Sequence, residues 1–211
     1  YDLGQVQALE PIKEGVENSN YRLRTTVGTY ILTIYEKRVR REELPFFLGL
    51  MEHLAAHGIP CPTPIKARDG KALREVAGKG AAIVTFLKGR STRSMRAEHC
   101  EGVGAGMARM HRAGATFKLQ RPNDLTLPGW RSLFEQCKIK ADTVARGLGD
   151  EIRAELDHLE AHWPKGLPSG VIHADMFPDN VFFERDRLSG IIDFYFACND
   201  AFADRKSTRL N

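Results

Sequence analysis

The first third of the chain changes from a strand-like to a helix-like pattern of hydrophobic positions. Two strand-like runs, Asn20–Thr26 and Thr29–Tyr35, flank the turn signal Val27-Gly28 and predict a β-hairpin. It belongs to β-structure that we expect to extend from residue 1 to about residue 36. From Glu42 to His57, apolar residues recur every three or four positions, which predicts a helix. Gly58 and the prolines behind it predict where this helix ends.

The remaining pattern divides the chain into a strand-rich and a helix-rich part. Short strands are predicted at Ile65–Ala67, Leu73–Val76 and Ala81–Leu87, and helices at Ala97–Gly114, Trp130–Gly147 and Asp150–Trp163. A glycine-containing hinge is predicted near residues 88–90. The order indicates an α+β fold with two lobes: a β-rich N-lobe over residues 1–88 and a mainly helical C-lobe over residues 89–203.

Composition narrows the class of protein. The chain has 211 residues, of which 42% are hydrophobic and 27% charged, as in ordinary globular proteins. No apolar run approaches the roughly 18 residues of a membrane span, and no signal peptide is expected. Four widely spaced cysteines, at positions 61, 100, 137 and 198, favour reduced thiols and a cytoplasmic location over a disulfide frame or a zinc site.

The formal net charge of +4 is unevenly placed along the chain. Three of the positive charges lie in the last seven residues, RKSTRLN, and the rest of the chain is nearly neutral. Basic patches that bind nucleic acid are clustered on the folded domain. We therefore expect neither a nucleic-acid partner nor a membrane partner, but a small-molecule substrate.

Polar residues interrupt strand-like sequence between Val171 and Phe196. The pattern is H-x-D-x-x-x-x-N, formed by His173, Asp175 and Asn180, followed by Asp193 thirteen residues later. Strands at Val181–Glu184 and Ile191–Phe194, joined by a turn at residues 185–190, predict a hairpin with Asn180 and Asp193 at one end. Two hard oxygen ligands of this kind suit Mg²⁺, with phosphate and water supplying the remainder.

The same spacing occurs in the catalytic loop of kinases. There the Asp accepts the proton of the substrate hydroxyl and the Asn binds Mg²⁺. The chemistry explains these residue types, because phosphoryl transfer depends on positioning and on neutralising charge. For His173, taken alone, we favour a structural role that braces the loop over proton transfer. The alternative for the whole motif is a capped loop with a hydrogen-bonded aspartate.

Three segments resemble the type II homoserine kinases. They read EGVENSNYRLRTTVGTYILTIYEKR, HADMFPDNVFF and GIIDFYFACND, and the likeness extends from Tyr1 to about Ala203. This family belongs to the aminoglycoside phosphotransferase and choline kinase-like superfamily. The resemblance implies a protein kinase-like fold and ATP-dependent phosphorylation of the L-homoserine hydroxyl to O-phosphohomoserine in threonine biosynthesis, with Mg²⁺.

The resemblance also implies roles for single residues. Asp175 would be the catalytic aspartate with His173 bracing its loop, and Asn180 and Asp193 would bind Mg²⁺. The turn at residues 14–20 would cover the phosphates. The residues implied for nucleotide binding are Gly15, Ser19, Asn20, Thr33, Lys37, Thr85 and Leu87. The candidates for contact with the acceptor are Tyr195, Asn199 and Asp200. Trp130 could also form a wall of the acceptor pocket, but for this residue we favour a role in core packing.

The chain departs from the superfamily pattern at several points. Thr33 stands where the third strand usually carries the Lys or Arg that contacts the phosphates. Lys37 and Arg38 are alternative candidates for this cation. Glu43 is the candidate for the glutamate of the following helix that pairs with it. Asp193-Phe194-Tyr195 replaces D-F-G, which favours a small-molecule kinase over a protein kinase. The resemblance also implies a chain truncated at both ends, with residues 204–211 as a non-native or disordered tail.

Two other functions stay open on the sequence. The first is another small-alcohol kinase, acting on choline, an aminoglycoside or a sugar. A choline kinase needs an aromatic cage for its quaternary ammonium, and the only aromatic cluster in the motif region is Phe194-Tyr195-Phe196. The second is an inactive nucleotide-binding fragment.

Overall fold

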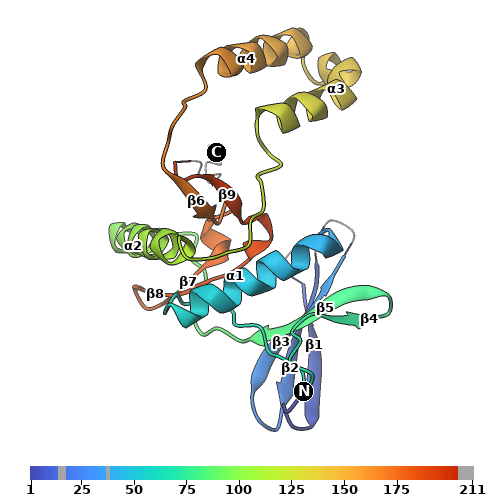
Figure 1. Ribbon diagram of the computed structural model, residues 1–211, viewed down its shortest axis with the longest axis vertical. Helices are drawn as coiled ribbons and strands as arrows, with labels where there is room; N and C mark the ends of the chain where they lie inside the picture. The colour runs from blue at the N-terminus through green and yellow to red at the C-terminus, as the bar shows by residue number, and fades with distance from the viewer. Residues whose placement is uncertain (14–17, 37–38, 204–211) are drawn as a thin grey trace.

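A five-stranded antiparallel sheet forms the N-lobe of the computed structural model, which describes residues 1–13, 18–36 and 39–203 (Figure 1). Its strand order is β1-β2-β3-β5-β4. The strands are β1 (Val6–Ile12), β2 (Asn18–Thr25), β3 (Thr29–Tyr35), β4 (Arg74–Val76) and β5 (Lys79–Thr85). The predicted β2–β3 hairpin is confirmed, and β3 has the predicted bounds.

The predicted strand at Ile65–Ala67 is wrong. This segment makes an isolated bridge, between Pro64 and Val84, and a hydrogen bond from the Ile65 N–H to the Ile83 carbonyl oxygen (2.8 Å). The prolines just before it explain the difference, because proline lacks the N–H that a strand ladder requires.

Helix α1 (Leu44–Ala56) connects the two lobes and confirms the predicted helix. A 3₁₀ turn at Arg41–Glu43 precedes it. The side chains of Phe47, Leu50 and Leu54 are fully buried, in a core that also contains Met110 and Ile191 of the C-lobe. In Figure 1 α1 crosses between the sheet and the C-lobe. One hydrophobic core therefore spans both lobes.

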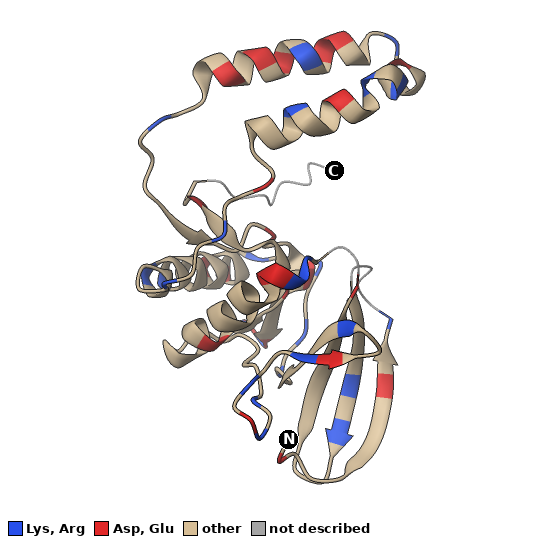
Figure 2. Ribbon diagram, turned by 45° about the vertical axis from the view of Figure 1, so that its right-hand side comes forward, with Lys and Arg blue, Asp and Glu red and all other residues tan. Residues whose placement is uncertain are grey.

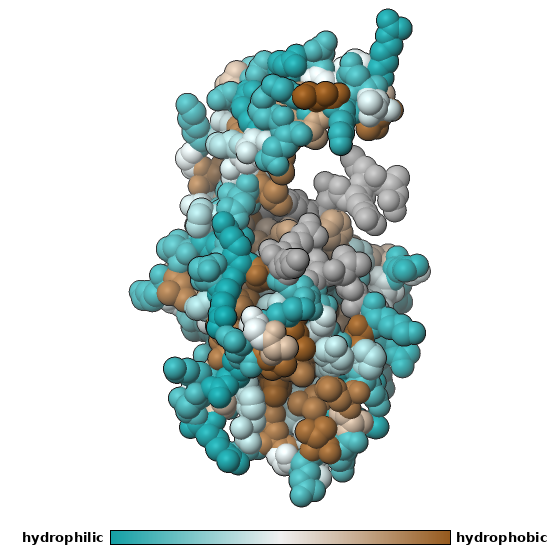
Figure 3. Space-filling model, turned by 90° about the vertical axis from the view of Figure 1, so that its right-hand side faces the viewer, coloured by the Kyte–Doolittle hydropathy of each residue, from teal (hydrophilic) through white to brown (hydrophobic). Residues whose placement is uncertain are grey.

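The C-lobe contains three helices and two small sheets. The helices are α2 (Ala97–Gly114), α3 (Leu127–Val144) and α4 (Leu148–His162). Helix α2 has the predicted bounds, whereas α3 and α4 begin three and two residues before the predicted Trp130 and Asp150. Strand β6 (Ser169–Ile172) pairs with β9 (Cys198–Ala201), and β7 (Val181–Glu184) pairs with β8 (Arg187–Ile191). Helices α3 and α4 form a hairpin that projects from the body (Figure 1) and has a largely hydrophilic surface (Figure 3).

The β7–β8 hairpin corrects two predictions. Its turn contains only Arg185 and Asp186, because Glu184 pairs with Arg187, and the second strand ends at Ile191 instead of running from Ile191 to Phe194. Arg185 takes the left-handed conformation (φ 54°) that such a tight turn needs. Arg187 and Ser189 alternate with Leu188 along a strand that is only partly buried. Their polarity is also typical of a turn, which explains why a turn is predicted there.

The segment after β5 is fixed on this hairpin. The Arg90 N–H donates to the Phe183 carbonyl oxygen (3.1 Å), the Phe183 N–H donates to the Arg90 carbonyl oxygen (2.9 Å), and the Ser189 hydroxyl donates to the Lys88 carbonyl oxygen (2.9 Å). Gly89 has a φ of 109°, and a Cβ there would lie 2.2 Å from Ser189 Oγ. The close approach therefore requires glycine at this position.

Candidate active site

The loop after β6 brings Asp175 and Asn180 into direct contact. The Asn180 side-chain Nδ2 donates to the Asp175 carbonyl oxygen (2.8 Å) and to the Asp175 carboxylate (2.9 Å). Both partners are acceptors, which assigns the nitrogen of the amide to this side. The Asn180 Oδ1 atom is therefore directed away from Asp175 and is the atom suited to a cation.

Asp193 lies at the same end of the hairpin as Asn180. Val181 pairs with Ile191, and the Ile192 N–H donates to the Asn180 carbonyl oxygen (2.9 Å). Asp193 follows directly in the left-handed conformation (φ 64°) and starts a 3₁₀ turn at Phe194–Phe196. The chain thus leaves the strand at Asp193, in the arrangement of Asn180 and Asp193 that the spacing predicts.

His173 lies beneath this loop as a buried, neutral imidazole. Its Nε2 is 2.9 Å from the Ile192 carbonyl oxygen and must be the donor, while its Nδ1 accepts the Asp175 N–H (3.2 Å). Burial lowers the pKa of His173 to about 4, although the bond to Ile192 acts in the opposite direction. A ring that stays neutral and uses both nitrogens connects the Asp175 loop to the residue before Asp193.

On one face of the sheet, Asn20 and Thr33 face each other. They are register partners of β2 and β3, and the Thr33 hydroxyl donates to the Asn20 Oδ1 (2.8 Å). Thr33 is only 2% exposed. Because neighbouring residues of a strand point to opposite faces, Ser19 lies on the other side of the sheet, where its hydroxyl donates to Glu36 (2.8 Å). The structure therefore separates Ser19 from Asn20.

Of the remaining nucleotide candidates, the structure describes Thr85 and Leu87. Gly15, Lys37 and Arg38 lie outside the described residues. At the hinge, the Thr85 N–H donates to the Thr63 carbonyl oxygen (3.0 Å) and the Thr85 hydroxyl accepts the Thr63 N–H (2.9 Å). The β5 ladder ends at Thr85, so Phe86 and Leu87 are the hinge residues beyond it that can offer backbone groups to a ligand.

The three acceptor candidates are held by bonds within the chain. The Asn199 Oδ1 accepts the Arg121 N–H (2.8 Å), and the Asp200 carboxylate accepts the Asn123 amide (2.6 Å). The Tyr195 ring packs edge-on against Tyr35, with ring centroids 5.3 Å apart. Burial raises the pKa of Tyr195 to about 12.

Arg121 and Asn123 escaped the sequence prediction. They belong to the irregular segment between α2 and α3, which has no periodic pattern, and their partners lie 77 and 78 residues away in sequence. No local sequence pattern therefore identifies Arg121 and Asn123 as site residues. Glu43, the predicted helix glutamate, accepts hydrogen bonds from Arg40 (2.6 Å) and Arg121 (2.9 Å). Burial acts to raise the pKa of Glu43, but these two bonds outweigh it and hold the pKa below its usual value.

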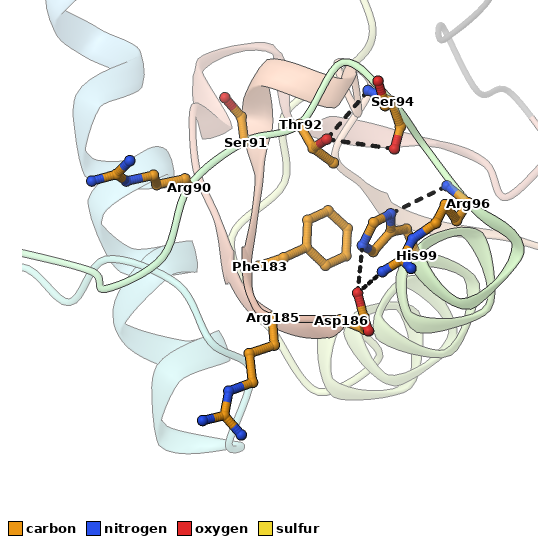
Figure 4. Close-up of a pocket in the computed structure, with 9 residues that line it drawn as sticks. All are labelled: Arg90, Ser91, Thr92, Ser94, Arg96, His99, Phe183, Arg185 and Asp186. Atoms are coloured by element: carbon orange, nitrogen blue, oxygen red, sulfur yellow. Dashed lines mark hydrogen bonds and ion pairs between the residues drawn. The ribbon is translucent and has the colours of Figure 1, made fainter.

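A separate pocket of about 400 Å³ lies at the turn end of the β7–β8 hairpin, away from Asn180 and Asp193. The His99 ring packs on Phe183 (centroids 4.5 Å apart), and Asp186 pairs with Arg96 and His99. Figure 4 shows the Arg185 side chain turned away from this cluster. Asp186, the acid of this pocket, already pairs with Arg96 and His99, so we place the candidate active site at the opposite end of the hairpin. The lining residues are Arg90, Ser91, Thr92, Ser94, Arg96, His99, Phe183, Arg185 and Asp186.

The donor set at Asn180 and Asp193 fits Mg²⁺. Within the described ranges, no group of three or more His, Cys, Asp and Glu side chains could hold a metal ion. Mg²⁺ does not need such a group, because it is commonly held by one or two protein oxygens together with substrate phosphates and water. Asn180 Oδ1 and the Asp193 carboxylate supply two hard oxygens at one end of the hairpin.

The lobes and this site define a phosphotransferase fold. The solved spectinomycin phosphotransferase, in complex with ADP and spectinomycin, superimposes with a TM-score of 0.72 at 13% identity, over 94% of this chain and 67% of that one. The chain belongs to the phosphotransferase enzyme family, whose sequence profile matches residues 8–203. The predicted fold class is therefore confirmed.

Within this family, the chain is similar to curated homoserine kinases. It is 59% identical over 211 residues to that of Nitrobacter hamburgensis and 57% identical to that of Xanthobacter autotrophicus. All of this chain is aligned, and it spans 65% and 66% of the length of those two relatives.

Proposed function

We propose that the chain carries the nucleotide-binding and catalytic parts of a homoserine kinase, which transfers the γ-phosphoryl group of ATP to the hydroxyl of L-homoserine and forms O-phosphohomoserine for threonine biosynthesis. The observation that carries the reaction type is the contact of Asp175 with Asn180, with Asp193 at the same end of the hairpin. The choice of homoserine rests on the identity of 57–59% to homoserine kinases over the whole chain.

Asp175 would orient the acceptor hydroxyl and take its proton. The Asn180 amide donates to the Asp175 carboxylate at Oδ2 (2.9 Å) and so fixes the orientation of that carboxylate. A positioned carboxylate of this kind contributes roughly 10²–10⁴-fold to a proton-transfer step. His173 would not exchange protons at neutral pH, since its pKa of about 4 keeps it neutral. It would hold the loop in place.

Asn180 and Asp193 would hold Mg²⁺, and the nucleotide would lie between them and the sheet. The metal, when bound, neutralises charge on the β- and γ-phosphates. On the sheet side, Thr33 fixes the Asn20 Oδ1, which turns the Asn20 Nδ2 outward as a neutral donor for a phosphate oxygen. Phe86 and Leu87 would offer backbone groups to adenine.

We place the protein in the cytoplasm, where its proposed substrates are made. Cys61, Cys100 and Cys137 are free thiols, as suits a reducing compartment. No helix in the described part of the chain combines the length and apolar character that crossing a membrane requires.

An acceptor screen tests this function. ADP release from Mg²⁺-ATP would be measured with homoserine, choline, an aminoglycoside and a sugar, with a homoserine kinase from one of the relatives as the positive control. We expect turnover that depends on homoserine and is lost in Asp175→Ala. Turnover with only another acceptor would assign a different small-alcohol kinase. Binding of Mg²⁺-ATP without any turnover would assign a nucleotide-binding module.

A further inference from the structure

Arg121 contacts elements of both lobes. Its Nε donates to Glu43, just before α1, at 2.9 Å. Its Nη1 donates to the Ala197 carbonyl oxygen (3.4 Å), directly after the 3₁₀ turn that Asp193 starts. The guanidinium carbon lies 5.3 Å from the centre of the Phe47 ring. One side chain thus contacts the start of α1 and the end of the Asp193 turn.

Four alternating charges form a ring around this contact. Glu43 accepts from Arg40 and Arg121, and Asp124 accepts from the same two arginines at 3.0 Å and 3.1 Å. The Arg121 and Glu43 side chains are only 13% and 16% exposed. Figure 2 shows acidic and basic residues side by side at the start of α1. A pair so shielded from water interacts more strongly than exposed ion pairs do.

The backbone of Arg121 is fixed as well. Its N–H donates to the Asn199 side chain (2.8 Å), and its carbonyl oxygen accepts the Asn199 N–H (2.7 Å). Pro122 continues this pairing as an isolated parallel bridge to Asn199. The guanidinium is therefore held in place from strand β9, so less side-chain entropy is lost when it pairs with Glu43.

The position of Arg121 matters because the third strand carries Thr33 where the superfamily usually has Lys or Arg. In protein kinases, a strand lysine paired with a helix glutamate must be in place together with the metal-binding aspartate. Here the strand position is Thr33, a buried neutral side chain that bonds to Asn20. Glu43 pairs with Arg40 of its own lobe and with Arg121 of the opposite lobe, and Arg121 also contacts the segment that begins at Asp193.

We propose that Arg121 is a positioning residue that aligns the start of α1 with the Asp193 segment through its ion pair with Glu43 across the lobes. The proposal rests on the proposed function, because it assigns the pair a role in binding Mg²⁺-ATP. It predicts that the pair acts on the metal and phosphate end of the nucleotide, since Arg121 contacts the Asp193 turn and α1, whereas adenine meets the hinge.

The test compares Mg²⁺-ATP with adenosine, which has neither phosphates nor metal. Calorimetric titrations would use the 211-residue chain, Arg121→Gln, Arg121→Lys, Glu43→Gln and the double variant. The matched control is Arg131→Gln, which also removes an arginine bonded to two carboxylates, Asp157 and Glu160, but on the α3–α4 hairpin.

We expect Arg121→Gln to weaken Mg²⁺-ATP binding about tenfold, which corresponds to about 1.4 kcal/mol, and to leave adenosine binding unchanged. Arg121→Lys should restore part of the affinity, because it keeps the charge without the planar fork. The double variant should be no weaker than either single variant, since both remove one interaction. Arg131→Gln should bind both ligands like the unmodified chain.

The results separate three conclusions. If the unmodified chain fails to bind Mg²⁺-ATP, the proposed function is wrong and the role of Arg121 is wrong with it. If the unmodified chain binds and Arg121→Gln binds equally well, only the role of Arg121 is wrong. If Arg121→Gln loses affinity for adenosine and for Mg²⁺-ATP equally, the role of Arg121 is also wrong, because equal losses indicate a general effect on the fold. If Arg121→Gln does not fold, the double variant serves, since it leaves neither Arg121 nor Glu43 as a buried unpaired charge.

Discussion

The buried imidazole of His173 should make the free energy of unfolding depend on pH. Burial lowers its pKa from 6.5 to about 4 in the folded chain, whereas the unfolded chain keeps the ordinary value. Between these two values only the unfolded chain takes up the proton, so acid favours unfolding. The stability that neutral His173 provides is fully present above about pH 6.5 and is lost as the pH falls toward 4.

The size of the effect follows from the shift. A difference of about 2.5 pKa units corresponds to about 3 kcal/mol at about 1.4 kcal/mol per unit. This is a substantial part of the roughly 5–15 kcal/mol by which domains are usually stable. The variant His173→Gln removes the titrating group and keeps a donor and an acceptor on the side chain. It should be less stable than the unmodified chain at pH 7, because the glutamine cannot reproduce both ring contacts.

Urea unfolding followed by circular dichroism at several pH values between 7 and 4 measures the effect. We expect the stability difference between the unmodified chain and His173→Gln to shrink by about 3 kcal/mol over this range. An equivalent change at His158, on the exposed surface of α4, is the control for replacing a histidine outside the loop. Parallel curves for the unmodified chain and His173→Gln would show that His173 is not held neutral by burial.

Three further predictions concern the site and the hinge. Asp175→Ala should lower turnover by roughly 10²–10⁴-fold while Mg²⁺-ATP affinity, measured by calorimetry, stays close to that of the unmodified chain. Asp193→Ala should instead raise the Mg²⁺ concentration needed for nucleotide binding, and equal loss of binding in both variants would contradict this division of roles. Gly89→Ala should lower the midpoint of urea unfolding, because the new Cβ meets Ser189 Oγ and the left-handed backbone penalises any side chain. An unchanged midpoint would show that the hinge segment can leave the hairpin at little cost.

The contact of Asp175 with Asn180 could be predicted because its geometry is local. Asn180 follows Asp175 by five positions, and a short hairpin brings Asp193 to the same end as Asn180. Helix α1 could also be predicted from the sequence, because its apolar residues recur with helical spacing. The second hairpin strand was misplaced because Arg187 and Ser189, on the exposed side of a strand, have the same polarity as a turn.

The contacts that join the lobes could not be predicted in this way. Arg121 meets Glu43 across 78 residues of sequence, from a segment with neither helical nor strand periodicity. The family resemblance implies a partner for Glu43 on or just after β3, whereas the structure pairs Glu43 with Arg40 and, across the lobes, with Arg121. The separation of Ser19 from Asn20 depends on the register of β2 against β3, which fixes the face that each residue takes.

The fixed segment Lys88–Arg90 has a consequence for motion between the lobes. Thr85 is bonded into the sheet and Lys88 and Arg90 are bonded to the β7–β8 hairpin, so bending of this connection is concentrated at Phe86 and Leu87. These are also the residues proposed to meet adenine. A ligand bound there would stiffen the connection between the two lobes.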